Sequence, residues 1–91
     1  MKEKKVKIVN KLGLHARPAS LLVQTAMKYS SNITIIKDEY KVDAKSIMGI
    51  LMLAASCGTE LIVQTEGPDE QEALDNIEKL FNEGFGEEIL L

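Results

Sequence analysis

The chain has 91 residues, a formal net charge of −3 at pH 7, 45% apolar residues and very few aromatic side chains. This length predicts a single domain over residues 1–91, and the apolar fraction excludes an intrinsically disordered chain. One cysteine, Cys57, and one histidine exclude an internal disulfide and a conventional zinc site, so we expect neither a metal nor a cofactor.

The charge is unevenly distributed along the chain. Residues 1–59 carry a net charge of +6 and residues 60–91 a net charge of −9. The basic part suits an acidic protein or a phosphate, whereas the low pI of about 5.1 and the lack of a Lys/Arg-aromatic pattern argue against nucleic acid. The longest apolar run, residues 47–55, is far shorter than the roughly 20 residues that span a bilayer. The lysine-rich start lacks the apolar core of a signal peptide, so we expect a cytoplasmic protein without membrane insertion.

Apolar residues alternate with lysines at the start of the chain. Val6 and Ile8, with Leu12 at the end, predict a first strand that Gly13 terminates. Helical spacing then predicts a helix that begins near His15–Ala16, with Pro18 in its first turn, where its ring is favourable. The apolar face of this helix is expected to hold Ala19, Leu22, Val23, Ala26 and Met27.

The middle of the chain predicts three strands and a short helix. Two strands, residues 33–36 and 40–42, flank a turn at Asp38-Glu39. Ser46 is the expected N-cap of a helix over residues 47–53, with Gly58 beyond its end. Another strand is marked by Leu61, Val63 and Thr65.

The Gly67-Pro68-Asp69 turn precedes a last helix that ends at residues 82–84. We expect Asp69 to cap this helix and to form a capping box with Glu72, and its acidic outer face to be a solvated surface. Its apolar stripe consists of Ala73, Leu74, Ile77, Leu80 and Phe81. The order β-α-β-β-α-β-α predicts an α+β fold, a four-stranded, mainly antiparallel sheet covered on one face by three helices in an open-faced two-layer sandwich.

The segment from Gly13 to Pro18 places the only histidine and an arginine at a helix start. Free backbone N–H groups and the helix dipole favour a phosphate there, and Arg17 adds a planar cation with several donors. Pro18 disfavours helical geometry at Arg17, so we expect the guanidinium beside the imidazole rather than along the helix. This pattern predicts His15 as the phosphoryl acceptor, with Ala16, Arg17 and Pro18 around the phosphate. A surface or capping histidine beside a solvated arginine is the alternative.

The residues from Ile47 to Leu53 are mostly large and apolar and surround the predicted short helix. A short helix on a sheet buries about half of its circumference, so some of these side chains are expected to form an exposed docking patch. The expected docking residues are Ser20, Ile47, Met48 and Leu51; the alternative is a fully buried helix. Ser46 is also a candidate phosphorylation site, the alternative being a plain N-cap serine. We interpret Cys57 as a small hydrophobe rather than a reactive thiol.

Two segments together resemble the HPr family, the histidine-containing phosphocarriers of the bacterial phosphoenolpyruvate-dependent sugar phosphotransferase system. They are Gly13-Leu14-His15-Ala16-Arg17-Pro18-Ala19 and Lys45-Ser46-Ile47-Met48-Gly49. The resemblance runs from the first strand to the last helix. It implies that His15 accepts a phosphoryl group on Nδ1 from Enzyme I and passes it to EIIA domains of sugar permeases, with Arg17 stabilising the group. It implies a carrier without turnover of its own, rather than an enzyme.

The serine segment is similar to the Gram-positive branch of this family. This resemblance implies phosphorylation of Ser46 by HPr kinase/phosphorylase and, in that state, binding to the transcription factor CcpA in carbon catabolite repression. The paralogue Crh lacks the active-site histidine, so the presence of His15 argues against that assignment. Two departures are Ala54, where many members have glycine, and an apolar tail over residues 86–91 that would cover a groove or mediate self-association.

Two further functions are compatible with parts of the sequence. One is a purely regulatory module in which Ser46 and the Met48 surface matter and His15 is idle. The other is a small RNA-binding domain, which would need aromatic side chains exposed on its sheet. The four aromatic residues, Tyr29, Tyr40, Phe81 and Phe85, do not form such a strand motif.

Overall fold

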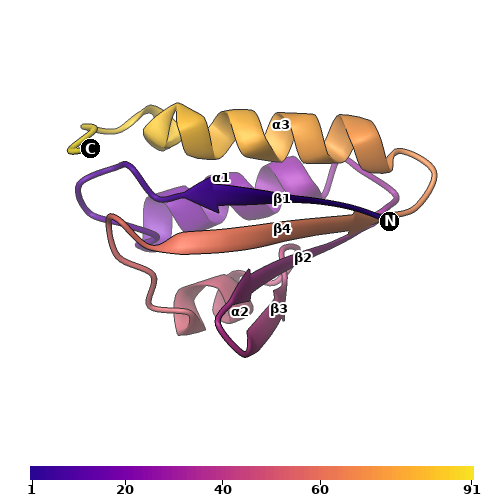
Figure 1. Cartoon of the computed structure of the whole chain (residues 1–91), viewed down its shortest axis with the longest axis horizontal. Helices are drawn as coiled ribbons and strands as arrows, with labels where there is room; N and C mark the ends of the chain where they lie inside the picture. The colour runs from indigo at the N-terminus through magenta and orange to yellow at the C-terminus, as the bar shows by residue number, and fades with distance from the viewer.

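Four strands and three helices follow one another in the order β-α-β-β-α-β-α in the computed structural model, which describes residues 1–91 (Figure 1). A short 3-10 turn, η1 (Gly84–Gly86), follows the last helix. The strands are β1 (Lys2–Lys7), β2 (Asn32–Lys37), β3 (Tyr40–Asp43) and β4 (Glu60–Glu66), and the helices are α1 (Ala16–Ala26), α2 (Ile47–Met52) and α3 (Glu70–Asn82). The predicted order and fold class are confirmed.

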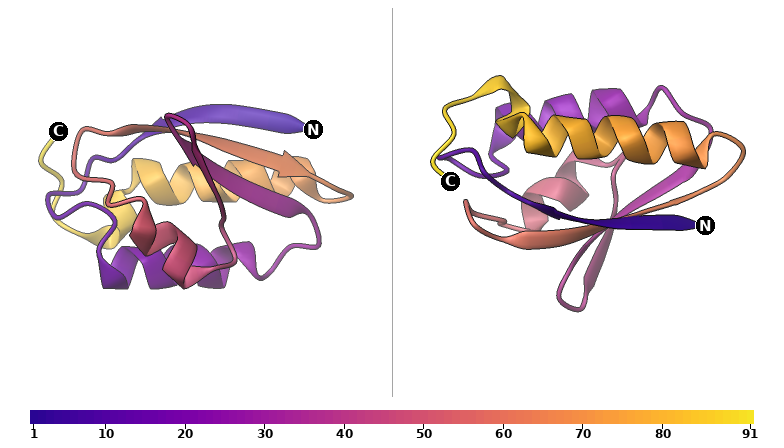
Figure 2. Two further views of the ribbon diagram at one scale, coloured as in Figure 1. Left: turned by 90° about the horizontal axis from the view of Figure 1, so that it is seen from below. Right: turned by 45° about the horizontal axis from the view of Figure 1, so that its top comes forward.

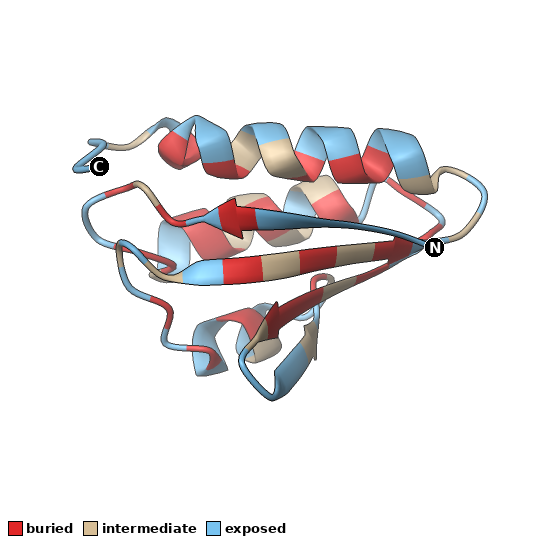
Figure 3. Ribbon diagram, viewed as in Figure 1, coloured by how far each residue is buried: buried red, intermediate tan, exposed pale blue.

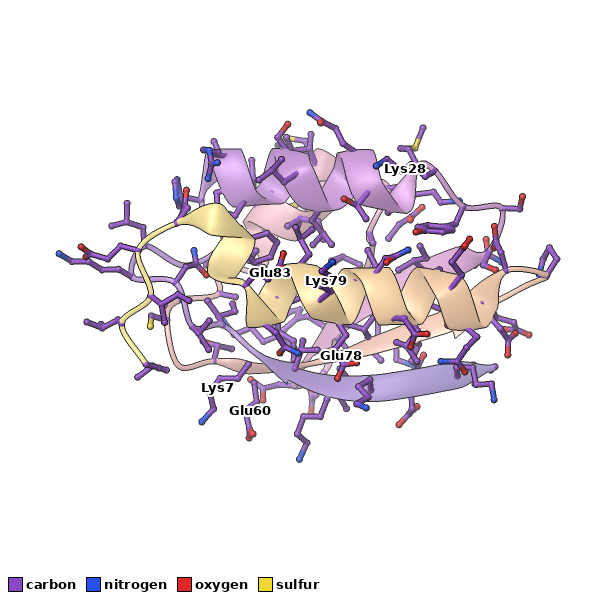
Figure 4. All side chains as sticks on the ribbon, turned by 90° about the horizontal axis from the view of Figure 1, so that it is seen from above. Lys7, Lys28, Glu60, Glu78, Lys79 and Glu83 are labelled. Carbon is purple, nitrogen blue, oxygen red and sulfur yellow. The ribbon has the colours of Figure 1, made fainter.

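The strands form one antiparallel sheet in the order β1-β4-β2-β3. In the register of the sheet, Val6 of β1 lies opposite Leu61 of β4, and Val63 of β4 lies opposite Ile35 of β2. The period of two in these strands therefore directs their apolar residues to one face. Lys7 and Glu60 are partners in the β1–β4 register and lie side by side at the margin of the sheet (Figure 4).

All three helices lie on the same side of the sheet, and the opposite face is open (Figure 2). The inner sides of α1 and α3 and alternate residues of β4 are buried (Figure 3). The core is aliphatic except for Tyr29, Phe81 and Phe85, as the composition predicts. Its largest fully buried side chains include Phe81, Ile8, Leu22, Ile33, Ile35, Ile50, Leu61, Ile77 and Val63. None of the helices combines the length and hydrophobicity that crossing a membrane requires.

Two residues at the ends of predicted elements are placed differently. Leu12 lies in a turn after β1 and is 67% exposed, because β1 ends at Lys7 and the chain turns at Asn10. Met27 follows the last residue of α1 as its C-cap and is 63% exposed, although its backbone is helical and its amide still donates to the Val23 carbonyl at 2.9 Å. Both predictions were wrong: Leu12 lies outside the strand, and Met27 lies beyond Ala26, the last buried residue of α1.

The cap of α3 also differs from the prediction. Asp69 is the N-cap residue, but its side chain makes no capping hydrogen bond. Its carboxylate accepts hydrogen bonds from the amides of Ser30 and Ser31 and from the hydroxyl of Ser31, in the loop between α1 and β2. Glu70, rather than Glu72, reaches back to the preceding turn and accepts a hydrogen bond from the Gly67 amide. The predicted capping box is therefore absent, because a stronger set of donors lies across the chain.

Candidate functional site

The loop before α1 is held against the segment that follows α2. The Leu14 amide donates to the carbonyl of Ala55 at 2.9 Å. Gly13 adopts a φ of +70°, and a Cβ atom there would lie 2.6 Å from the same carbonyl oxygen. Only glycine permits both this conformation and this close approach. The loop therefore delivers His15 to the N-cap position of α1.

His15 presents a partly exposed imidazole at the start of α1. Its side chain is 38% exposed and makes no cap hydrogen bond to the helix. The ring nitrogen Nε2 lies 2.9 Å from Oε1 and 3.0 Å from Oε2 of Glu87, which is 72 residues further along the chain. His15 is therefore not a capping histidine, because its ring binds a carboxylate from the C-terminal segment instead of the helix backbone.

Glu87 is the centre of a hydrogen-bonded cluster. Besides His15, it accepts hydrogen bonds from Nδ2 of Asn10 at 3.1 Å and from Nη1 of Arg17 at 3.1 Å. Partial burial would raise the pKa of the Glu87 carboxyl, but the hydrogen bonds from His15, Asn10 and Arg17 outweigh burial and hold this pKa below its ordinary value. Glu87 is therefore an ionised carboxylate at neutral pH.

Arg17 shares the Glu87 carboxylate with His15, but its backbone differs from the prediction. It is the second residue of α1, so the prediction that Pro18 would keep it out of helical geometry was wrong; Pro18 fits the first turn and leaves Arg17 helical. Its Nη1 donates to Glu87 and, at 3.1 Å, to the carbonyl of Phe85. The side chain is 58% exposed, and its remaining guanidinium donors make no hydrogen bond within the chain. These donors are available for an anion.

Two backbone donors are also free at this helix start. The amides of Ala16 and Arg17 make no backbone hydrogen bond, as is usual in the first turn of a helix. Pro18 has no N–H to offer, so of the three residues expected around a phosphate only Ala16 and Arg17 can donate. An anion bound next to His15 would meet two amides and one guanidinium.

A strained turn positions the C-terminal segment over this site. Gly84, Phe85 and Gly86 have φ values of +62°, +56° and +72°, and the left-handed conformation is costly for a bulky residue such as Phe85. The buried Phe85 ring contacts Phe81 edge-to-face, with centroids 4.9 Å apart. After Glu87 the tail bridges back to the first loop, with Ile89 opposite Asn10, and the Leu90 amide donates to the Val9 carbonyl at 2.9 Å. The tail is thus fixed at two points on either side of Glu87.

The sequence did not reveal Glu87 and Asn10 as site residues. Glu87 is one of ten acidic residues among residues 60–91, and Asn10 is a buried polar residue without a motif. The one available signal was the pair of glycines around Phe85, which permits the turn that brings Glu87 to the histidine. A pocket of about 370 Å³ lies between the first loop and the tail, lined by Lys11, Leu12, Glu87 and Glu88. Ile89, Leu90 and Leu91 do not line it and are each at least half exposed, so the expectation that the tail covers a groove or mediates self-association stays a prediction.

The short helix α2 has the exposed apolar surface expected of a docking patch. Only Ile50 is buried, whereas Ile47, Met48, Leu51 and Met52 are 41%, 64%, 36% and 78% exposed. A fully buried helix is thereby contradicted. Helix α2 packs against α1, where Ser20 is half-buried and accepts a hydrogen bond from Gln24. Ser46 is exposed and caps α2, its hydroxyl accepting a hydrogen bond from the Gly49 amide at 3.2 Å.

Comparison with known proteins identifies close similarity over almost the whole chain. Residues 2–83 match the family model described as "PTS HPr component phosphorylation site". The chain is 51% identical over 85 residues to the phosphocarrier protein HPr of Treponema pallidum, covering 93% of this chain and 97% of the relative. It is 49% identical over 77 residues to the HPr-like protein Crh of Bacillus subtilis, covering 85% and 91% of the two chains. A crystal structure of HPr from Thermoanaerobacter tengcongensis is 53% identical and superimposes with a TM-score of 0.94, covering 98% of this chain and 100% of the other.

Proposed function

The chain belongs to the HPr family of phosphocarrier proteins, and on this premise we propose that His15 carries a phosphoryl group between two protein partners of the sugar phosphotransferase system. The donor is phosphorylated Enzyme I, and the acceptors are EIIA domains of sugar permeases. Residues 1–91 act as one cytoplasmic domain. The chain is a carrier that is itself modified and restored, rather than an enzyme with independent turnover.

The observation that carries this proposal is the arrangement around the ring of His15. The imidazole is partly exposed, Nε2 is occupied by Glu87, and the free amides of Ala16 and Arg17 lie at the same helix start. Nδ1 is therefore the nitrogen left to attack. Its lone pair forms the new bond to phosphorus while the bond from phosphorus to the donor nitrogen breaks, and that electron pair stays on the donor. Transfer to an EIIA domain is the same displacement with Nδ1 of His15 as leaving group.

Phosphorylation of the purified chain tests this proposal. Incubation with phosphoenolpyruvate and Enzyme I is expected to add one acid-labile phosphoryl group, detected by intact mass, and a His15→Ala variant is expected to add none. A folded His15→Ala variant that is phosphorylated as fast as the unaltered chain would overturn the assignment. Enzyme I activity is established in the same experiment with a second phosphocarrier.

We further propose that Ser46 is a regulatory phosphorylation site. Its hydroxyl is exposed beside the apolar surface of α2, and a phosphate at this N-cap would be favoured by the helix start while placing a near-dianion next to Ile47 and Met48. The modification is expected to leave the fold intact, weaken docking to Enzyme I and create a surface for CcpA. Treatment with HPr kinase/phosphorylase and ATP is expected to modify the chain but not a Ser46→Ala variant.

A regulatory module without phosphotransfer is the second candidate, and the 49% identity to Crh of Bacillus subtilis favours it. Identifying which residue is phosphorylated, and by which enzyme, distinguishes the carrier from the regulatory module. If Enzyme I phosphorylates the chain on His15, the chain is a carrier; if only the Ser46 kinase modifies it, the regulatory module alone remains.

A further inference from the structure

Glu87 makes a contact to His15 that determines where the proton of the imidazole lies. The carboxylate is ionised and can only accept hydrogen bonds, and both of its oxygens lie within 3.0 Å of Nε2. Nε2 must therefore carry the proton, in the neutral ring as well as in the charged one. In the neutral ring this leaves the lone pair on Nδ1, the atom that has to attack phosphorus.

The same carboxylate also positions the guanidinium. Nη1 of Arg17 is held between Oε2 of Glu87 and the carbonyl of Phe85, both at 3.1 Å. Two acceptors on one nitrogen fix the plane of the group and leave the other donors free to meet a phosphate. A single side chain thus fixes the orientation of both groups that are expected to hold the phosphoryl group.

The residues around Glu87 hold its carboxylate in this position. Asn10 is fully buried, and its Nδ2 donates both to Glu87 and, at 2.8 Å, to the carbonyl of Gly13. Its Oδ1 has no partner, which is an energetic cost that a buried asparagine bears only where its other bonds compensate. On the other side, the strained backbone of Phe85 directs Glu87 toward the ring.

We propose that Glu87 is a positioning residue for phosphoryl transfer, which fixes the Nε2–H tautomer of His15 and aligns Arg17. This proposal rests on the proposed function of His15. During transfer the new bond forms at Nδ1, the bond from phosphorus to the donor breaks, and the proton stays on Nε2, where it is shared with Glu87. The positive charge that develops on the ring is stabilised by the carboxylate. No proton has to leave the site.

A Glu87→Gln variant tests the proposal, because glutamine retains the shape of the side chain but lacks its charge. Glu88→Gln is the matched control: Glu88 is adjacent, 72% exposed and paired with Lys11 at 3.5 Å, and it does not contact His15. Two quantities are measured on all three proteins. One is the ¹⁵N chemical shift of Nδ1 and Nε2 of His15 near neutral pH, which reports the tautomer. The other is the rate of phosphorylation by Enzyme I at limiting and at saturating carrier concentration.

The unaltered chain and Glu88→Gln are expected to show the Nε2–H tautomer and equal rates. Glu87→Gln is expected to show a mixture of tautomers and a phosphorylation rate at saturation that falls about tenfold, as for the loss of one charge-assisted hydrogen bond. An unchanged tautomer with an unchanged rate would refute the positioning role. A faster Glu87→Gln variant would refute it too, because Glu87 would then compete with the phosphoryl group. Failure of the unaltered chain to be phosphorylated would instead refute the proposed function.

Discussion

Asp69 connects the start of α3 to the loop before β2 through its carboxylate. The hydroxyl of Ser31 contributes most to lowering the pKa of Asp69, and the Ser30 amide adds to it; partial desolvation opposes both, and the Ser31 amide lowers the pKa further. The hydrogen bonds from the Ser30 and Ser31 amides to the Asp69 carboxylate are each 2.9 Å long. Because the pKa is lower in the folded chain than in the unfolded chain, ionised Asp69 stabilises the fold above the unfolded-state pKa. This contribution disappears as the pH falls through the folded-state pKa.

We expect an Asp69→Asn variant to be less stable than the unaltered chain at pH 7. The difference in free energy of unfolding should begin to narrow as the pH falls below about 3.9, the ordinary aspartate value, because Asp69 then becomes protonated in the unfolded chain. It should vanish below the lower folded-state pKa, where both chains are uncharged at this position. Urea unfolding between about pH 2 and pH 7 measures it. Asp75→Asn is the control, since Asp75 is exposed on α3 and accepts only one side-chain hydrogen bond, from Gln71. A stability difference for Asp69→Asn that does not vary with pH would contradict this account.

Ala54 has a φ of +50°, in the left-handed region that glycine adopts more readily than alanine. The left-handed conformation costs an alanine roughly 1–2 kcal/mol, whereas glycine adopts it freely but loses roughly 0.5–1 kcal/mol more backbone entropy on folding. The first effect is larger, so Ala54→Gly is expected to raise the free energy of unfolding by about 0.5–1 kcal/mol. Ala54→Val, with a β-branched side chain at the same φ, is expected to lower it. Urea denaturation measures the change in free energy of unfolding for both variants. Changes in the same direction would show that backbone strain at this position is negligible.

At the scale of the elements, α2 combines a well-formed cap with an exposed apolar surface. We expect Met48→Ala to weaken binding to Enzyme I by about 5- to 30-fold, the effect of truncating a contact worth 1–2 kcal/mol. The stability of the chain should change by less than about 0.5 kcal/mol, because the side chain is 64% exposed. Titration calorimetry measures the affinity.

Met27→Ala is the matched control for this surface. Met27 is 63% exposed but lies at the C-terminal end of α1, away from His15 at its start. Its substitution is expected to leave the affinity for Enzyme I unchanged. If Met27→Ala and Met48→Ala weaken binding equally, α2 is not the docking surface.

The elements were predictable from sequence because each carries a local signal. Each signal lies inside the element that it predicts or directly before it. Examples are the period of two in β4, the apolar stripe of α3 and Ser46 before α2. The His15 loop was predictable for the same reason. Contacts between distant segments carry no such signal, so the carboxylate of Glu87 on Nε2 of His15 was missed. Asp69 was mispredicted for the same reason. Its neighbours in sequence favour a capping box, but its carboxylate accepts hydrogen bonds from Ser30 and Ser31, which are distant in sequence.

At the scale of the whole molecule, the two oppositely charged parts of the sequence meet along β1 and α3. Glu78 lies on the side of α3 that faces β1 (Figure 4), and its carboxylate is 3.3 Å from Nζ of Lys4. The terminal ammonium lies 3.4 Å from the carboxylate of Glu70. Such partly exposed pairs contribute about 0–1 kcal/mol each. The charge asymmetry is thus partly satisfied within the chain, while the outer face of α3 remains acidic.

The site lies at one end of the molecule. The connection from β1 to α1, the segment after α2 and the C-terminal tail meet there, whereas the N-terminus lies at the opposite end (Figure 1). Loop residues positioned by packed helices and strands suit a surface that the two proposed partners would reach in turn. The start of α1 therefore holds the histidine, and Glu87 of the tail completes its environment.

The most direct test of the central claim is an NMR measurement of the chain labelled with ¹⁵N at its single histidine and phosphorylated by Enzyme I. We expect one phosphoryl group, a phosphorus–nitrogen coupling to Nδ1, and a proton retained on Nε2. A phosphoryl group bonded to Nε2, or to any residue other than His15, would contradict it.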